Sequence, residues 1–194
     1  MTGTPAPATP GLHLDFPRSW QAEILSARPA ILPARRCVYP RDAEEVDRGA
    51  LEVLIRPAMD GTQPFLATCA LGFRDPIVPT GVWSCPHPDE LLAVAGGYAY
   101  VIDITAPERF TMIAFRPVLE IRPLAAEGLM LFVGHHAILA WGRAGLAWQS
   151  GKVSDEGVTI TSLEAGTLHG LGWNRITDKE TAFALDLSTG HAIP

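Results

Sequence analysis

The feature that most constrains this chain is a strand-and-turn pattern that recurs every 38 residues in its second half. Gly96, Gly134 and Gly172 each close a short apolar run, at residues 91–95, 129–133 and 168–171. A strand-like segment follows each glycine, at 98–104, 137–141 and 181–187, and another precedes each apolar run, at 82–85, 118–121 and 158–161. With further segments at 110–115 and 146–149, the pattern indicates units of four short β-strands.

This layout, over residues 82–194, resembles the blades of β-propellers of the WD or quinoprotein type. The units lack the Gly-His and Trp-Asp signatures of the first type and the Trp-bearing consensus of the second, so the resemblance assigns no functional residue. It implies an all-β fold, a propeller-like array of four-stranded antiparallel units. A β-sandwich or barrel built from the same hairpins is the alternative. Closed propellers typically have four to eight blades, so three units predict either a fourth, irregular blade from the first half or an open array.

The length of 194 residues fits a single β domain at 12–194, with 1–11 as a flexible tail. Residues 12–80 read as an irregular N-terminal part, because prolines break it into short extended pieces near 21–27 and 34–39. A hairpin is expected at 51–71 around the turn dipeptide Asp60-Gly61. Asp42 is in position to cap one short helix at 43–46. The three repeat-like units then occupy 82–194.

Composition narrows the classes of partner. The formal net charge is −6, which argues against a nucleic-acid partner, and no stretch approaches the ~20 apolar residues that span a bilayer. The start of the sequence lacks the basic and apolar regions of a signal peptide, so we expect a cytoplasmic protein. Cys37, Cys69 and Cys85 are odd in number and have no CxxC spacing, which indicates reduced, mostly buried thiols rather than a secreted disulfide framework.

Connectivity alone predicts where a site would lie. In a four-stranded meander, the turn between the second and third strands falls on the same side of the sheet as the linker to the next unit. This side collects the candidate ligand-binding residues, which are Tyr98, Arg116, His135, His136, Trp173, Arg175 and Asp178. Loops carry binding chemistry more often than strands do, so we expect a binding rim there.

Catalytic signals are weak. His135 and His136 would need a further ligand, such as His169 or a carboxylate, to hold a metal ion. Cys85-Pro86-His87 places a thiol near an imidazole without an evident orienting partner. No nucleotide-binding or hydrolase motif is present, so no catalytic residue, metal or cofactor is assigned, and enzyme activity is left open.

Three functions are compatible with these observations. The first is a non-enzymatic module that binds a protein or small-molecule ligand through the loops of one face. The second is a metal-assisted hydrolase or lyase with a His-containing loop site. The third is a structural subunit whose open sheet edge is completed by a partner, which includes a homo-oligomer.

Overall fold

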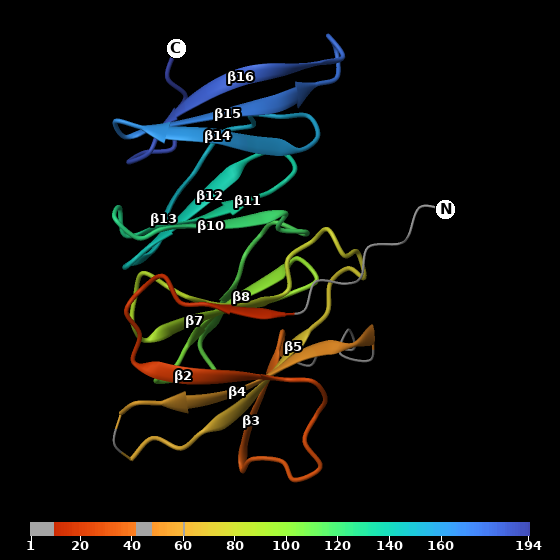
Figure 1. The fold of residues 1–194 in the computed structure, drawn as a ribbon, viewed down its shortest axis with the longest axis vertical. Coiled ribbons are helices and arrows are strands. Elements are labelled where there is room, and N and C mark those ends of the chain that lie inside the picture. Colours follow the sequence, from red (N-terminus) through yellow and green to blue (C-terminus); the bar gives the residue numbers. More distant parts are fainter. Residues whose placement is uncertain (1–9, 42–47, 60) are drawn as a thin grey trace. The chain divides into compact units, whose positions relative to one another are not determined.

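The computed structural model describes residues 10–41, 48–59 and 61–194, and in these residues the regular structure consists of sixteen β-strands without an α-helix (Figure 1). The all-β, propeller-like class expected from the sequence is confirmed, since the strands form small, mainly antiparallel sheets of three to five members. The helix expected at 43–46 and most of the tail expected at 1–11 lie outside the described residues, and Gly11 already belongs to the first strand. Within the described part of the chain, no helix has the length and apolar character needed to cross a membrane.

The chain divides into two compact units, Met1–Pro117 and Val118–Pro194, called here the N-terminal and C-terminal units. Each is described by itself, and the single domain expected at 12–194 stays a prediction.

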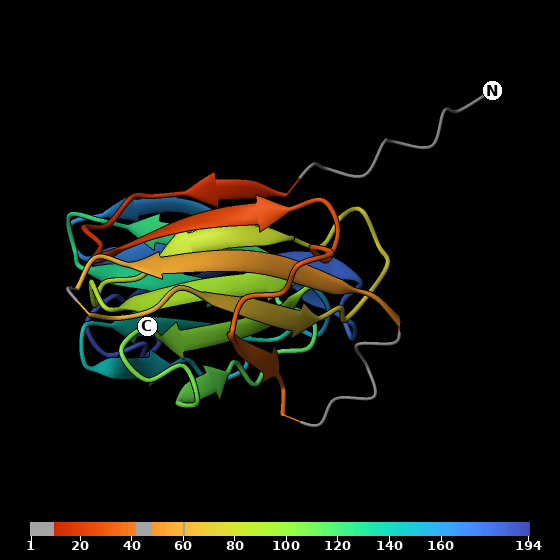
Figure 2. The same cartoon turned by 90° about the horizontal axis from the view of Figure 1, so that it is seen from below.

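The N-terminal unit contains two sheets. One has the order β1-β6-β7-β8-β9, with β1 (Gly11–His13) parallel to β6 (Gly81–Ser84), followed by an antiparallel meander through β7 (Glu90–Ala95), β8 (Tyr98–Asp103) and β9 (Phe110–Met112). The other has the order β2-β4-β5-β3 and consists of β2 (Trp20–Leu25), β4 (Ala50–Pro57), β5 (Phe65–Ala70) and β3 (Arg35–Tyr39). Figure 2 shows the second sheet from below.

The part of the sequence expected to be irregular, 12–80, therefore contains a complete four-stranded sheet. The hairpin expected at 51–71 is formed by β4 and β5, and the extended pieces near 21–27 and 34–39 contain β2 and β3. The irregularity lies in the order of the strands, because β3 pairs in parallel with β5 instead of following β2 in a meander.

Alternating side chains of both sheets form the core of the N-terminal unit. Leu51, Val53 and Ile55 of β4 point to one face, as strand geometry requires of every second residue. They pack with alternate residues of β5, β7 and β8, namely Phe65, Ala67, Cys69, Leu91, Ala93, Ala95, Tyr100 and Ile102. Burial raises the pKa of the Cys69 thiol, so this group stays neutral in the core.

The C-terminal unit contains two antiparallel meanders. The first comprises β10 (Glu120–Leu124), β11 (Leu129–Val133), β12 (Ile138–Gly142) and β13 (Gly145–Gln149). The second comprises β14 (Val158–Glu164), β15 (Thr167–Asn174) and β16 (Lys179–Asp186), and no fourth strand pairs with β16 among the described residues. Only an isolated antiparallel bridge, Leu185 to Ala192, occupies the position where the four-stranded pattern requires a further strand.

Side chains of both meanders share one core in the C-terminal unit. Its members include Leu131, Val133, Ile138 and Ala140 from the first sheet and Val158, Ile160, Leu168 and Leu185 from the second. Trp148 of β13 is buried among them, and its indole N–H donates to the Leu187 carbonyl oxygen at 2.7 Å. A buried indole needs such a partner, and this bond ties the end of the first meander to the turn after β16.

Candidate functional site: a braced loop cluster in the C-terminal unit

Three connecting segments meet in the C-terminal unit, and we call them the loop cluster: the β11–β12 turn (134–137), the β13–β14 linker (150–157) and the β15–β16 turn (175–178). The Val153 N–H donates to the His136 carbonyl oxygen at 2.8 Å, which joins the linker to the first turn. The Asp155 N–H donates to the Trp173 carbonyl oxygen at 2.7 Å, which joins the linker to the end of β15. Within this unit, the side of the sheets expected from connectivity is therefore the side on which these segments gather.

Ser154 braces the loop cluster. Its side chain is buried, and its hydroxyl oxygen accepts hydrogen bonds from the backbone N–H groups of Trp173 at 2.9 Å and Glu156 at 3.1 Å. The same hydroxyl donates to the Gly157 carbonyl oxygen. One buried side chain thus satisfies three backbone groups of two segments that are not adjacent in sequence, which fixes the path of the linker over β15.

Gly172 allows the linker to approach β15 closely. A Cβ atom at this position would lie 2.1 Å from the Val153 carbonyl oxygen, a distance that side chains do not tolerate. Gly172 is one of the three equally spaced glycines, so its role here is the close passage of a second backbone segment.

The Asp155 carboxylate makes an ion pair and a hydrogen bond within the loop cluster. Its carboxylate lies 2.5 Å from the Lys152 ammonium group and accepts a hydrogen bond from the Arg175 backbone N–H at 2.8 Å. These two interactions, with that of Lys152 the larger, lower the pKa of Asp155 below its ordinary value of 3.8. The carboxylate therefore stays charged at neutral pH and holds the linker against the β15–β16 turn.

The β15–β16 turn is short and presents an apolar tip. The Asn174 side-chain oxygen accepts from the backbone N–H groups of Ile176 at 3.0 Å and Thr177 at 3.1 Å, and Asp178 adopts a left-handed φ of 55°. Ile176 is 94% exposed at the tip, and its neighbour Arg175 is also exposed.

Trp173 follows the apolar run at 168–171 and was expected in the connection to the strand at 181–187, but it lies in β15, paired with Glu180 of β16. The predicted position was wrong because Asn174 supports a tight turn. As a result, β15 continues to Asn174 and β16 begins at Lys179. Trp173 is half-buried on the sheet, next to the loop cluster.

His135 and His136 do lie in a turn, and both are exposed. Their ring centroids are 6.1 Å apart, and His136 Nδ1 lies 3.3 Å from the Ser154 carbonyl oxygen. Within the described residues, no group of three or more His, Cys, Asp or Glu side chains is arranged to hold a metal ion. A metal at the two imidazoles would need ligands from elsewhere.

Tyr98 and Arg116 belong to the N-terminal unit, so their grouping with the other five candidates stays a prediction. The two residues do contact one another, because the Arg116 guanidinium carbon lies 5.7 Å from the centroid of the Tyr98 ring. Phe73 packs edge-on against the same ring at 5.9 Å. Tyr98 is the first residue of β8, in agreement with the strand expected at 98–104, and these neighbours contact its ring.

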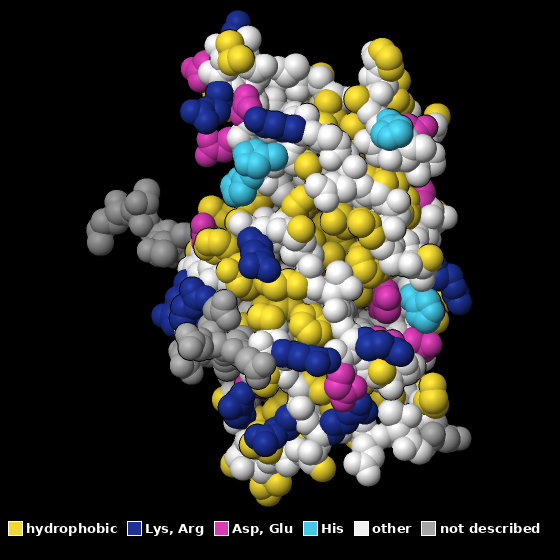
Figure 3. All heavy atoms as spheres, turned by 180° about the vertical axis from the view of Figure 1, so that it is seen from behind, with side chains coloured by type: hydrophobic (Ala, Val, Ile, Leu, Met, Phe, Trp, Pro, Cys, Tyr) yellow, Lys and Arg dark blue, Asp and Glu magenta, His cyan; other side chains and the backbone are white. Residues whose placement is uncertain are grey.

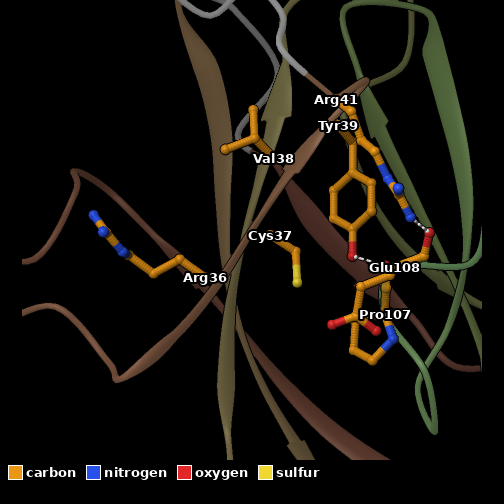
Figure 4. Close-up of a pocket in the computed structure, with 7 residues that line it drawn as sticks. All are labelled: Arg36, Cys37, Val38, Tyr39, Arg41, Pro107 and Glu108. Atoms are coloured by element: carbon orange, nitrogen blue, oxygen red, sulfur yellow. Dashed lines mark hydrogen bonds between the residues drawn. The ribbon is translucent and has the colours of Figure 1, made fainter.

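A cavity of about 260 Å³ in the N-terminal unit was not predicted. It is lined by Arg36, Cys37, Val38, Tyr39, Arg41, Pro107 and Glu108 (Figure 4). Cys37 and Tyr39 point to one side of β3, toward the β8–β9 turn, while Arg36 and Val38 point to the other. The alternating pattern of β3 indicated that Cys37 and Tyr39 share a face, but no sequence signal connects them with Pro107 and Glu108.

The polar groups of this cavity bind one another. The Tyr39 hydroxyl donates to the Pro107 carbonyl oxygen at 2.7 Å, and Arg35 donates to both carboxylate oxygens of Glu108, at 2.7 and 3.0 Å. The Arg35 bond lowers the pKa of Glu108, whereas partial burial raises the pKa of the Cys37 thiol. A neutral thiol is a poor nucleophile, so the arrangement supports β3 rather than a reaction.

The arginines near the start of the chain also contact neighbouring side chains of the N-terminal unit. Figure 3 shows Arg side chains on the visible surface of the N-terminal unit, with hydrophobic side chains between them. Arg28 pairs with Glu52 at 3.0 Å, and the Arg18 guanidinium carbon lies 5.9 Å from the centroid of the Trp20 ring. These contacts hold individual arginines against neighbouring side chains, while Arg36 and Arg41 line the cavity beside β3 and Arg18 lines a second cavity with Trp20.

Comparisons with known proteins assign no family. No family model matches the chain, and no curated protein matches its sequence significantly. Among solved structures, the chain is similar to the N-terminal domain of Nup159, at 13% sequence identity and a TM-score of 0.35. The match covers 93% of this chain and 52% of that one, so the chain spans about half the length of the structure that it matches.

Proposed function

We propose that the protein is a non-enzymatic interaction module that binds a protein partner through the loop cluster. The observation that carries this proposal is the bracing by Ser154, whose hydroxyl holds the β13–β14 linker against the end of β15 before any partner binds. Loops that are already ordered lose less conformational entropy on binding, so more of their contact energy contributes to affinity.

The residues of the cluster fit a protein surface. Ile176 supplies a fully exposed apolar side chain, and Arg175, His135 and His136 supply polar groups around it. An apolar contact with a polar rim that contains Arg is typical of protein interfaces.

The proposal extends to the environment of the protein. The net charge of −6 supports a protein partner over a nucleic acid. Three free cysteines, two of them buried, support a reducing compartment, and we place the module in the cytoplasm.

Affinity capture with matched surface variants tests the proposal. The tagged full-length chain and its Ile176→Asp variant would be expressed in the source cells, and captured proteins would be quantified by mass spectrometry. Ile31→Asp is the control, because Ile31 is 91% exposed but lies in the N-terminal unit. We expect at least one partner to be lost with Ile176→Asp and retained with Ile31→Asp.

The interaction would then be measured with purified proteins. Calorimetry should show that Ile176→Asp weakens binding of the captured partner by about tenfold or more, since a charge replaces an apolar contact. If every captured protein bound both variants equally, the loop cluster would not be the binding surface.

A further inference from the structure

The last sheet of the C-terminal unit ends in an incomplete edge. β16 pairs with β15 along its whole length, from Lys179 to Asp186, without a shift of register. On its other side, only its final residues are paired. The Asp186 N–H donates to the His191 carbonyl oxygen at 2.9 Å, and the Ile193 N–H donates to the Ala184 carbonyl oxygen at 2.9 Å. The segment 191–193 thus begins a fourth strand, antiparallel to β16.

The phase of these bonds shows which backbone groups of β16 remain available. Ala184 and Asp186 direct their N–H and C=O groups toward the outer edge, and every second residue of a strand does the same. Glu180 and Ala182 are therefore in phase with them. No other strand pairs with this part of the edge among the described residues.

The same stretch of β16 is open to solvent on both faces. Residues 179–182 are all exposed, whereas Leu185, further along the strand, is buried. An uncovered edge with a regular register is a template for a further strand, and proteins normally block such edges with a bulge, a proline or a covering segment. The stretch has neither a proline nor a register shift, and its charged residues are Lys179 and Glu180.

The side chains of the stretch specify what a further strand would carry. A strand that continues the line of 191–193 would place residues opposite Ala182, Thr181, Glu180 and Lys179 in turn. Ala182 is small and pairs with Leu171 of β15, so a larger apolar residue of the added strand fits opposite Ala182. A basic residue opposite Glu180 and an acidic residue opposite Lys179 complement the charges, and a β-branched residue suits the position opposite Thr181.

We propose that the free edge of β16 binds an extended protein segment by strand addition. The segment runs antiparallel to β16 and presents, in order, an apolar, a β-branched, a basic and an acidic residue. Its backbone exchanges hydrogen bonds with Glu180 and Ala182. This inference does not rest on the function proposed for the loop cluster, because the edge would remain available even if Ile176 contacted no partner.

A designed peptide provides a direct test. The full-length ¹⁵N-labelled chain would be titrated with the amidated peptide Leu-Val-Arg-Glu-Thr, which begins opposite Ala182, and followed by NMR. We expect saturable changes in the amide signals of Glu180 and Ala182, with only small changes in the core strand β11. The Ile176→Asp variant should bind the peptide as well as the unchanged chain does, which separates this test from that of the loop cluster.

Backbone methylation supplies matched controls within the peptide. The arginine opposite Glu180 directs its N–H toward β16, whereas the valine opposite Thr181 directs its N–H away. Methylation of the arginine nitrogen should weaken binding roughly tenfold by removing a donor and adding bulk, and methylation of the valine nitrogen should have less than about a twofold effect.

Two protein variants complete the test. Ala182→Pro removes an N–H that faces the edge, so we expect the ladder with β15 to persist and peptide binding to be lost. Glu180→Lys should weaken binding of the peptide. The same variant should bind a second peptide, with glutamate in place of arginine, more tightly than the unchanged chain does. The second variant remains informative if the proline variant does not fold.

Three results would overturn the proposal. The first is the absence of signal changes at Glu180 and Ala182 up to the solubility limit of the peptide. The second is equal weakening by the two methylated peptides. The third is a change of the same amide signals with protein concentration alone, which would assign the edge to a second copy of the chain.

Discussion

In both units, a segment outside the sheets crosses a glycine at close range, but the two crossings have opposite results. In the N-terminal unit, a Cβ atom at Gly96 would lie 2.2 Å from the Phe73 carbonyl oxygen. In the C-terminal unit, a Cβ atom at Gly172 would lie 2.1 Å from the Val153 carbonyl oxygen. The first crossing covers an aromatic side chain, and the second carries polar side chains, of which Lys152 is exposed and Ser154 is buried.

The difference lies in what the crossing segments carry. Residues 72–73 donate backbone hydrogen bonds to Ala95 and Gly96, both at 2.9 Å, and Phe73 then packs against Tyr98. The linker in the C-terminal unit instead carries Lys152, Ser154 and Asp155, which bind backbone groups and one another. The glycines at 96 and 172 therefore allow a second segment to pass, whereas the residues of that segment decide whether the place becomes a core or a candidate site.

Substitution of the crossed glycines should have the largest effects. Gly96 has a left-handed φ of 56°, so Gly96→Ala combines backbone strain with a clash and should lower the free energy of unfolding by about 3 kcal/mol. Gly172→Ala involves the clash alone, and about 2 kcal/mol is expected. Gly128→Ala is the control, because Gly128 has a φ of 65° without an atom within 4 Å of the added Cβ, and about 1 kcal/mol is expected.

Urea denaturation of the three glycine variants would test this order. Equal losses of stability in all three would mean that the close crossings contribute nothing beyond the glycine backbone itself.

Ser154→Ala should have the next largest effect. The substitution leaves the N–H groups of Trp173 and Glu156 without their hydroxyl acceptor, which should cost about 1.5 kcal/mol. Hydrogen exchange at the Trp173 amide should accelerate accordingly. Ser188→Ala, at an exposed serine, should change stability by less than about 0.5 kcal/mol. An unchanged exchange rate at Trp173 would show that the linker is held without Ser154.

The contact between Phe73 and Tyr98 should contribute less. A double-mutant cycle with Phe73→Leu and Tyr98→Leu should give a coupling energy of about 1 kcal/mol, typical of edge-on aromatic pairs. Denaturant unfolding of the two single variants and the double variant measures it. Additive effects would indicate that Phe73 covers Tyr98 without a specific contact.

Acid should loosen the loop cluster by a smaller amount. The pKa of Asp155 is lower in the folded chain than its ordinary value of 3.8, so its stabilising effect is complete above that value. This effect is lost as the pH falls through the lower, folded pKa. The amide signal of Arg175 should therefore shift below about pH 4 in an NMR titration, because its acceptor becomes protonated. Asp155→Asn should abolish this transition, and a persistent shift would assign it to another carboxyl group.

The sequence predicted the meanders better than the pairings between distant strands. The units of β10–β13 and β14–β16 follow from alternation and turn residues, because each strand pairs with its neighbour in sequence. The parallel pairing of β3 with β5 could not be predicted, since the alternation of a strand shows which face is buried but not which strand lies beside it.

The sequence likewise predicted some parts of the candidate site and missed others. Connectivity placed His135, His136 and the β13–β14 linker on one side of the C-terminal sheets, and the hydrogen bonds of this unit join them. Ser154 was missed, because a serine in a Gly- and Lys-containing linker resembles any other loop residue until Trp173 is placed beside it. Tyr98 and Arg116 contact each other, although their positions in the sequence indicated only a shared rim.

The pairing of β1 with β6 has a consequence for how the chain folds. Four strands separate these two in the sequence, so the five-stranded sheet is incomplete until a long loop has closed. The strands of the C-terminal unit pair only with their neighbours in sequence, so their ladders require no such closure. Rates of folding fall as contacts become more distant in sequence, so pulse-labelled hydrogen exchange during refolding should show protection in β10–β16 before it appears in β1 and β6.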